Sequence, residues 1–142
     1  MPASPFTHET ITALTQELGL ILPAAYEEAL LHYPFPSDSE VARTTFFGSP
    51  DLITEANQAV RVDGFLGHGW PDAYLVIGTD GIGDLNFLDT NLDEPNVQVA
   101  EQERSTMNEM FVDDTGFDLT EWLDRLIAAE RRRSPDSGNR PS

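Results

Sequence analysis

The stretch 70–89, WPDAYLVIGTDGIGDLNFLD, constrains the fold more than any other part of the chain. Ala73–Ile77 is an unbroken apolar run with β-branched and aromatic members, which predicts a strand buried on both faces. The glycine-rich segment 78–84 follows, and glycine supplies the positive φ angles that a tight reversal needs. Leu85–Leu88 then predicts a second strand. The stretch therefore predicts a β-hairpin whose turn presents two aspartates.

The length and the residue types that are missing limit what the rest can be. At 142 residues the chain fits one domain with a substantial core. There is no cysteine, which excludes disulfides, thiolate catalysis and cysteine zinc sites and permits a reducing compartment. We find no signal-peptide pattern and no apolar run of the roughly 20 residues that a membrane span needs. We therefore expect a cytoplasmic protein that does not enter a membrane.

The charge of the chain is strongly negative. There are 25 acidic residues against 8 basic ones, for a formal net charge of −17. Residues 1–130 hold four arginines and 24 acidic residues, a formal charge of −20. Such a field repels nucleic acid and anionic lipid and speeds encounter with a basic partner. The alternative is a charged surface that serves only solubility.

Four helices are predicted around the hairpin. They are expected from Thr7 to Gly19, from Pro23 to Tyr33, from Ser49 to Val60 and from Asp118 to Arg133. In the last one, Asp118 with Glu121 forms a capping-box pattern, and Phe117 before the cap is placed to pack on Trp122. We expect residues 1–130 to form the single domain and the arginine-containing segment 131–142 to be a disordered basic tail.

Three more segments are expected to be strands. Thr44–Phe47 is β-branched and then aromatic, the residues 97–99 alternate between apolar and polar, and Met110–Val112 is a short apolar run. No βαβ repeat is present, and the connections between strands are short. The order of elements therefore predicts an α+β domain with a mainly antiparallel central sheet flanked by about four helices.

This order of motifs resembles the SUKH superfamily of Smi/Knr-type proteins over roughly residues 9–128. The chain has a helix opening LPAAYEEALLHY, a strand ending FFG, a helix after SPDLI, the block WPDAYLVIGTDGIGDLNFLDT and a closing helix with FDLTEWLDRL. The central block is the most specific part. The resemblance implies an α+β fold and, for most bacterial members, a non-enzymatic immunity protein that neutralises a cognate toxin, often a nuclease or nucleic-acid deaminase. Fungal members are linked to cell-wall regulation, which leaves a regulatory scaffold as the alternative.

An acidic surface is the electrostatic complement of a basic substrate cleft, so we expect a basic toxin protein as partner and a monomer or weak dimer. Trp70 follows three glycines and precedes Pro71, which suggests either a core ring or an aromatic anchor at the rim of the sheet. The candidate partner-binding residues are Trp70, Asp72, Asp80, Asp84, Asp89, Asp93, Glu94, Glu101 and Glu103.

Other kinds of site are less favoured. Asp80, Asp84 and Asp89 could bind calcium, but their spacing does not fit an EF-hand loop, and they could instead only shape a turn. The glycines after the first strand lead into a second strand, whereas a dinucleotide loop leads into a helix. The histidines lack metal-ligand spacing, and no GxSxG elbow is present. We expect no metal, no cofactor and no catalytic residue, with a metal-dependent enzyme as the last alternative.

Overall fold

The computed structural model describes residues 6–36, 38–80, 83–106 and 108–133. The helices are α1 (His8–Leu18), α2 (Ala24–Leu31), α3 (Glu40–Arg43), α4 (Pro50–Asp63) and α5 (Leu119–Arg133). The strands are β1 (Tyr74–Thr79), β2 (Leu85–Asp89), β3 (Asn96–Glu101) and β4 (Phe111–Asp118). Each strand pairs antiparallel with the next, in the order β1-β2-β3-β4. The predicted α+β fold with an antiparallel sheet is confirmed.

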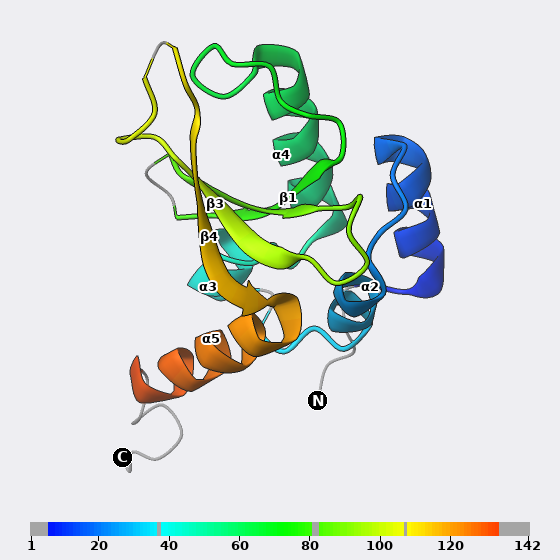
Figure 1. Ribbon diagram of the computed structural model, residues 1–142. Coiled ribbons are helices and arrows are strands. Elements are labelled where there is room, and N and C mark those ends of the chain that lie inside the picture. The colour runs from blue at the N-terminus through cyan, green and yellow to red at the C-terminus, as the bar shows by residue number, and fades with distance from the viewer. Residues whose placement is uncertain (1–5, 37, 81–82, 107, 134–142) are drawn as a thin grey trace.

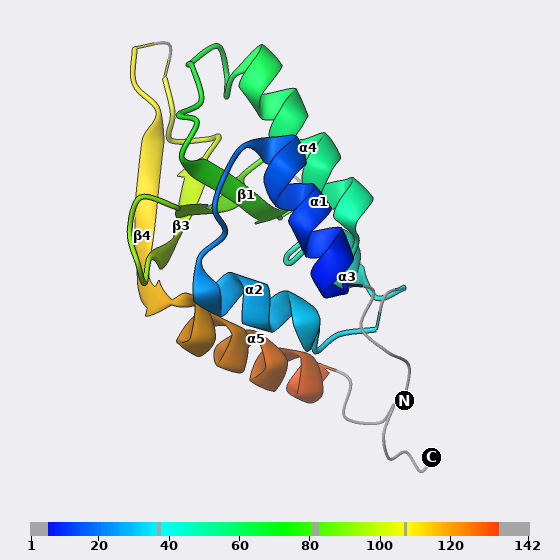
Figure 2. The ribbon, with the colours of Figure 1, turned by 90° about the vertical axis from the view of Figure 1, so that its right-hand side faces the viewer.

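The helices pack in two pairs around this sheet. α1 contacts α4, which lies along β1, and α2 contacts α5, which reaches β3 and β4 (Figure 1). Figure 2 shows α1 beside α4 and α2 running alongside α5. The core between these layers includes Tyr26, Phe46, Leu75, Phe87 and Val97, each at most 1% exposed. No described helix is both long and apolar enough to cross a membrane.

Local capping signals explain where the helices begin and end. Ser49 accepts a hydrogen bond from the Asp51 N–H at the start of α4, and Gly19 ends α1 with φ of 68°. Asp118 Oδ1 accepts from the Glu121 N–H at 2.9 Å, which confirms the predicted cap of α5. The second predicted helix is shorter than expected: Pro23 precedes it and its last residue is Leu31.

The two rings expected to pack as a staple at the start of α5 have other partners. Trp122 is half-buried and meets Phe46 edge-on, with ring centroids 6.1 Å apart. The Arg125 guanidinium carbon lies 4.1 Å from the centre of the Phe117 ring. Trp122 therefore packs against the edge of the core, whereas the Phe117 ring packs against the Arg125 guanidinium at the surface.

The prediction of a strand at Thr44–Phe47 is wrong. The short helix α3 ends at Arg43, and the next residues turn, with the Thr44 N–H donating to the Glu40 carbonyl. The segment nevertheless runs along β1, because the Phe47 N–H donates to Ile77 O at 2.9 Å and the Thr79 N–H to Thr44 O at 2.8 Å. Its β-forming residues therefore cover an edge of the sheet without forming a continuous ladder.

All four strands are longer than predicted, and β2 and β3 extend to Asp89 and Glu101. β1 continues through Gly78 and Thr79, where the sequence predicts the turn, and its pairing with β2 shifts register between Val76 and Gly78. β4 extends over eight residues to Asp118, although only its first two residues belong to the predicted strand Met110–Val112. Pairing with β3 imposes this length on an acidic segment of low β-propensity. Residues 131–133, which were expected in the disordered tail, instead form the end of α5. The rest of the predicted tail, residues 134–142, lies outside the described residues.

Candidate functional site

Trp70 is part of the core. Its side chain is 6% exposed, its Nε1–H donates to Tyr74 O at 2.9 Å, and its ring meets Phe87 edge-on with centroids 5.2 Å apart. Phe65 and Tyr74 pack against the same ring. Because the ring is enclosed, the prediction of Trp70 as an anchor at the rim is wrong for this conformation.

The remaining eight acidic candidates fall at two opposite ends of the sheet. In an antiparallel meander, the β1–β2 and β3–β4 connections share one end, and the β2–β3 connection lies at the other. The first group, at what we term the β1–β2 end, comprises Asp80, Asp84, Glu101 and Glu103. The second group, at the β2–β3 end, comprises Asp72, Asp89, Asp93 and Glu94. The candidates therefore form two separate sites.

At the β1–β2 end, two aspartates are engaged in local hydrogen bonds. Asp80 Oδ1 accepts from the Asp84 N–H at 3.1 Å, and Asp84 Oδ1 accepts from the Gln102 N–H at 2.8 Å. Glu101 is paired with Arg104 at 3.3 Å. Residues 81–82, between the two aspartates, lie outside the described residues. Asp80 therefore shapes the β1–β2 turn, and Asp84 joins that turn to the start of the β3–β4 connection.

At the β2–β3 end, Asp89 also has a local role. Its Oδ1 accepts from the Asn91 N–H at 3.0 Å, and its carbonyl accepts from the Leu92 N–H at 3.1 Å. The Thr90 hydroxyl donates to Ala73 O at 2.7 Å, which fixes the turn to the start of β1. Asp93 and Glu94 follow this anchored turn, and both are exposed.

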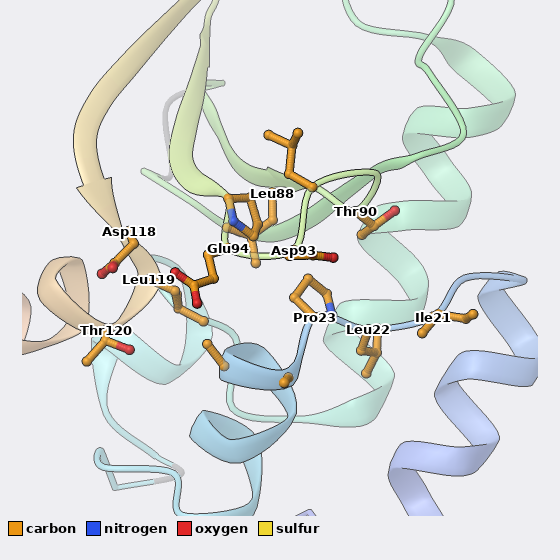
Figure 3. Close-up of a pocket in the computed structure, with 14 residues that line it drawn as sticks. Ile21, Leu22, Pro23, Leu88, Thr90, Asp93, Glu94, Asp118, Leu119 and Thr120 are labelled. Atoms are coloured by element: carbon orange, nitrogen blue, oxygen red, sulfur yellow. The ribbon is translucent and has the colours of Figure 1, made fainter.

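A surface groove of about 660 Å³ opens at this end (Figure 3). It lies between three segments that are distant in sequence: the link before α2, the β2–β3 turn and the junction of β4 with α5. Figure 3 shows their side chains converging on it. The residues that line it are Ile21, Leu22, Pro23, Ala24, Ala25, Leu88, Thr90, Leu92, Asp93, Glu94, Pro95, Asp118, Leu119 and Thr120.

The floor and the rim of the groove differ in character. Leu22, Leu88 and Leu119 are at most 7% exposed and form an apolar floor. At the rim, Ile21 is 87% exposed and Leu92 is 52% exposed. Three carboxylates, those of Asp93, Glu94 and Asp118, also line the groove, and its described lining contains no arginine, lysine or histidine. The groove is therefore apolar within and anionic at its margin.

Sequence reasoning missed part of this groove. Ile21 belongs to an apolar link between helices, and Asp118 is recognisable only as a helix cap. One local signal was present: Leu92 is a lone large apolar residue within the polar turn TNLDEPN. A single exposed apolar residue is common on protein surfaces, so Leu92 becomes informative only because it lines a groove together with Ile21.

One carboxyl group close to this end has a perturbed pKa. Hydrogen bonds from the Gly116 N–H and from the side chains of Gln98 and Asn96 hold the pKa of Asp114 below its usual range. Asp114 lies on β4, opposite Gln98. The carboxylate is exposed, and its hydrogen bonds lie where the pairing of β3 with β4 shifts register, so we interpret it as a structural group that holds this irregular part of the sheet.

The arrangement also bears on the calcium hypothesis. Asp89 lies at the β2–β3 end, whereas Asp80 and Asp84 lie at the other, so the three carboxylates do not share a site. Within the described ranges, no group of three or more histidine, aspartate or glutamate side chains is placed to hold a metal ion. The calcium alternative for Asp80, Asp84 and Asp89 therefore has no common site in the described part of the structure.

Comparison with known proteins agrees with the fold. The model of the SMI1/KNR4 family (SUKH-1) matches residues 5–125. No curated protein and no solved structure matches the chain significantly. The chain is an α+β domain built on an antiparallel four-stranded meander. It is a member of the SMI1/KNR4 family (SUKH-1).

Proposed function

We propose that this chain is a bacterial immunity protein that binds and neutralises a cognate toxin domain and catalyses no reaction itself. The observation that carries the proposal is the set of outward-facing acidic side chains on a member of this family. Asp72, Asp80, Asp93, Glu94 and Glu103 are all exposed, on a body whose residues 1–130 have a formal charge of −20.

The negative charge of the chain favours toxins that have a basic surface. A nuclease or nucleic-acid deaminase needs a basic surface to bind phosphate, and an anionic protein can compete for that surface. Complementary charge raises the association rate and disfavours acidic partners. We therefore propose a basic, nucleic-acid-processing toxin domain as the partner, bound in the cytoplasm of the cell that makes both proteins.

Co-expression tests this proposal. The toxin domain encoded beside the gene for this chain is expressed from an inducible promoter, alone or with the chain. We expect growth to stop with the toxin alone and to be restored by the chain. A catalytically inactive toxin variant then allows binding to be measured, and the association rate is expected to fall about tenfold between low and high salt.

The same experiment separates this function from the alternatives. A regulatory scaffold would leave toxicity unchanged and would bind endogenous cell-wall regulators. A metal-dependent enzyme would show stoichiometric heat of binding when titrated with calcium, magnesium or zinc. Absence of both rescue and binding with the neighbouring toxin domain would refute the proposed function.

A further inference from the structure

We propose that the groove at the β2–β3 end is the docking site for a partner segment that carries an apolar side chain next to an arginine or lysine. This inference rests on the proposed function for the identity of the partner. The chemistry of the docked segment follows from the residues that line the groove. The proposal gives the two ends of the sheet different roles: the β2–β3 end contacts the partner, and the β1–β2 end stabilises the fold.

The first argument is the exposed apolar rim. Large hydrophobic side chains that are exposed in the described structure are Ile21, Val62, Leu66, Leu92 and Phe111. Two of them, Ile21 and Leu92, line the same groove and come from segments about 70 positions apart in sequence. Exposed apolar side chains that line one surface hollow are typical of a protein contact, where a partner's apolar group can replace water on both.

The second argument is charge. The carboxylates of Asp93, Glu94 and Asp118 line the groove, and its described lining offers no cation to neutralise them. An apolar ligand alone would desolvate these groups without compensation. In a segment with a cationic side chain beside an apolar one, the apolar group packs on the floor of the groove and the cation pairs with the carboxylates at its margin. The same carboxylates repel acidic segments.

The third argument is preorganisation. The turn that presents Leu92 is fixed by the bonds of Asp89 to Asn91 and Leu92, and Pro23 and Pro95 stiffen two of the walls. The floor residue Leu119 begins α5 directly after Asp118, whose carboxylate caps that helix. Little ordering is needed on binding, so contacts at the rim contribute to affinity with a small entropic loss.

The size of the groove limits the occupant. About 660 Å³ lies within the range of roughly 300–1,000 Å³ typical of ligand sites. Such a volume accepts a few side chains of a loop or strand and not a whole helix. The remainder of a standard interface would come from the surrounding acidic surface.

The decisive variants remove the apolar rim while keeping the fold. Ile21 and Leu92 are exposed, so Ile21→Ser with Leu92→Ser is expected to leave the free energy of unfolding nearly unchanged. We expect the double variant to bind the inactive toxin domain about 30-fold more weakly by calorimetry, as for loss of an interface hot spot. The matched control is Val62→Ser, since Val62 is 83% exposed on α4 and lies outside the groove.

A matched pair of charge variants tests the assignment of the two ends. Glu94→Gln removes an exposed carboxylate in the groove, and Glu103→Gln removes one at the β1–β2 end. We expect the first to slow association about threefold or more and the second to change it less than about twofold. Wild-type affinity in the double apolar variant, or a larger effect of Glu103→Gln, would overturn the inference.

A second probe tests the groove independently if the wild-type chain does not bind the toxin domain. Without rescue as well, that outcome refutes the proposed function but does not decide whether the groove is a docking site. The probe is a short synthetic peptide with an Arg-Leu-Arg core, titrated into the ¹⁵N-labelled chain and followed by NMR. We expect amide shift changes concentrated at 21–25, 90–95 and 118–120, and smaller ones with Arg-Ser-Arg or Glu-Leu-Glu peptides. In that case, shifts centred on 101–106, or no shifts, would overturn the docking site.

Discussion

Asn57 forms with Val76 both hydrogen bonds that a neighbouring strand would form. Asn57 Oδ1 accepts from the Val76 N–H at 2.8 Å, and Asn57 Nδ2 donates to Val76 O at 2.9 Å. The same amide donates to Ile53 O at 2.8 Å within α4. A single buried side chain therefore fixes α4 to the outer edge of β1 and satisfies backbone groups that water cannot reach.

Replacing this side chain should destabilise the protein severely. Asn57→Ala leaves the N–H and the carbonyl of Val76 buried without a partner, and each such group costs about 1–3 kcal/mol. We therefore expect the free energy of unfolding in urea to fall by about 2–5 kcal/mol. Asn91→Ala is the matched control, because Asn91 is exposed, and it should change stability by less than about 0.5 kcal/mol. Equal effects of the two variants would contradict the role of Asn57.

Gly78 is required for the close approach of segment 44–47 to β1. A Cβ at this position would lie 1.9 Å from the Thr45 carbonyl oxygen, which is a backbone atom that cannot rotate away. We expect Gly78→Ala to reduce the free energy of unfolding by about 3 kcal/mol or more. At Gly69, no described atom lies within 4 Å of the added Cβ, so Gly69→Ala should be tolerated in the same urea titration. A stable Gly78→Ala variant would show that the segment is not held against β1.

The two sheet edges are protected in different ways. Asn57 and the backbone of segment 44–47 cover β1, whereas β4, at the other edge, carries the exposed residues Asp113 and Asp114. Charges on an edge strand oppose pairing with a second sheet. The acidic composition of the chain therefore also has a structural use that is separate from partner binding.

The parts of the fold that sequence reasoning captured have local causes. The hairpin, the Ser49 and Asp118 caps and the Gly19 stop depend on residues within a few positions of one another. By contrast, the extent of β4 depends on its pairing with β3, and the conformation of residues 44–47 depends on their hydrogen bonds to β1. Gly78 illustrates the difference: locally it is a turn residue, yet packing against Thr45 makes it a strand residue.

The site was less predictable for a topological reason. The acidic candidates lie within one stretch of the sequence, residues 72–103, but successive turns of an antiparallel meander lie at opposite ends of the sheet. The groove joins residues near 21, 92 and 118, and no local pattern relates them. Burial of Trp70 is also a tertiary property, because it depends on Phe65 and Phe87 packing around the ring.

Leu66 adopts a backbone conformation that suits another residue better. Phe65 and His68 exchange two backbone hydrogen bonds across a two-residue turn in which Leu66 has φ of 52° and Gly67 φ of 86°. Positive φ at both positions favours Asn-Gly, and a leucine there costs about 1–2 kcal/mol. We expect Leu66→Asn to raise the free energy of unfolding by about 0.5–1 kcal/mol, net of the lost apolar contact.

Leu92→Asn is the control for this stabilisation. Leu92 is 52% exposed and Leu66 is 50% exposed, so both variants lose similar apolar area, but Leu92 does not have a positive φ. Only Leu66→Asn should therefore shift the urea midpoint upward. A matching shift in both variants would mean that replacing an exposed leucine with a polar side chain is stabilising by itself, whatever the backbone conformation.

Two core tyrosines should respond in opposite directions to loss of their hydroxyl groups. Tyr26 Oη is buried with no hydrogen-bond partner in the described structure, whereas Tyr33 Oη donates to Phe46 O. Burial raises the pKa of both phenols, so both are neutral at ordinary pH. We expect Tyr26→Phe to leave stability unchanged or raise it by up to about 1 kcal/mol, and Tyr33→Phe to lower it by about 1 kcal/mol in urea denaturation. Destabilisation by Tyr26→Phe would reveal a partner for its hydroxyl.

Asp114 should give stability a measurable dependence on acidic pH. Its pKa is lowered in the folded protein because the Gly116 N–H, Gln98 and Asn96 hydrogen-bond its charged form. A depressed folded pKa means that the contribution is fully present above the unfolded pKa of about 4 and is lost as the pH falls through the folded value. Asp114→Asn should therefore be less stable than wild type at pH 7, and the difference should shrink below about pH 4.

The control for this pH dependence is Asp113→Asn, on the same strand and also exposed. Both substitutions remove one negative charge, so the general relief of repulsion in a chain of net charge −17 is common to them. Subtracting their pH profiles, measured by urea denaturation from pH 3 to pH 7, leaves the part due to the hydrogen bonds of Asp114. The bonds with Gln98 and Asn96 join β3 to β4, whereas the bond with Gly116 lies within β4. Parallel profiles for the two variants would therefore mean that the carboxylate stabilises neither the pairing of these strands nor the local backbone of β4.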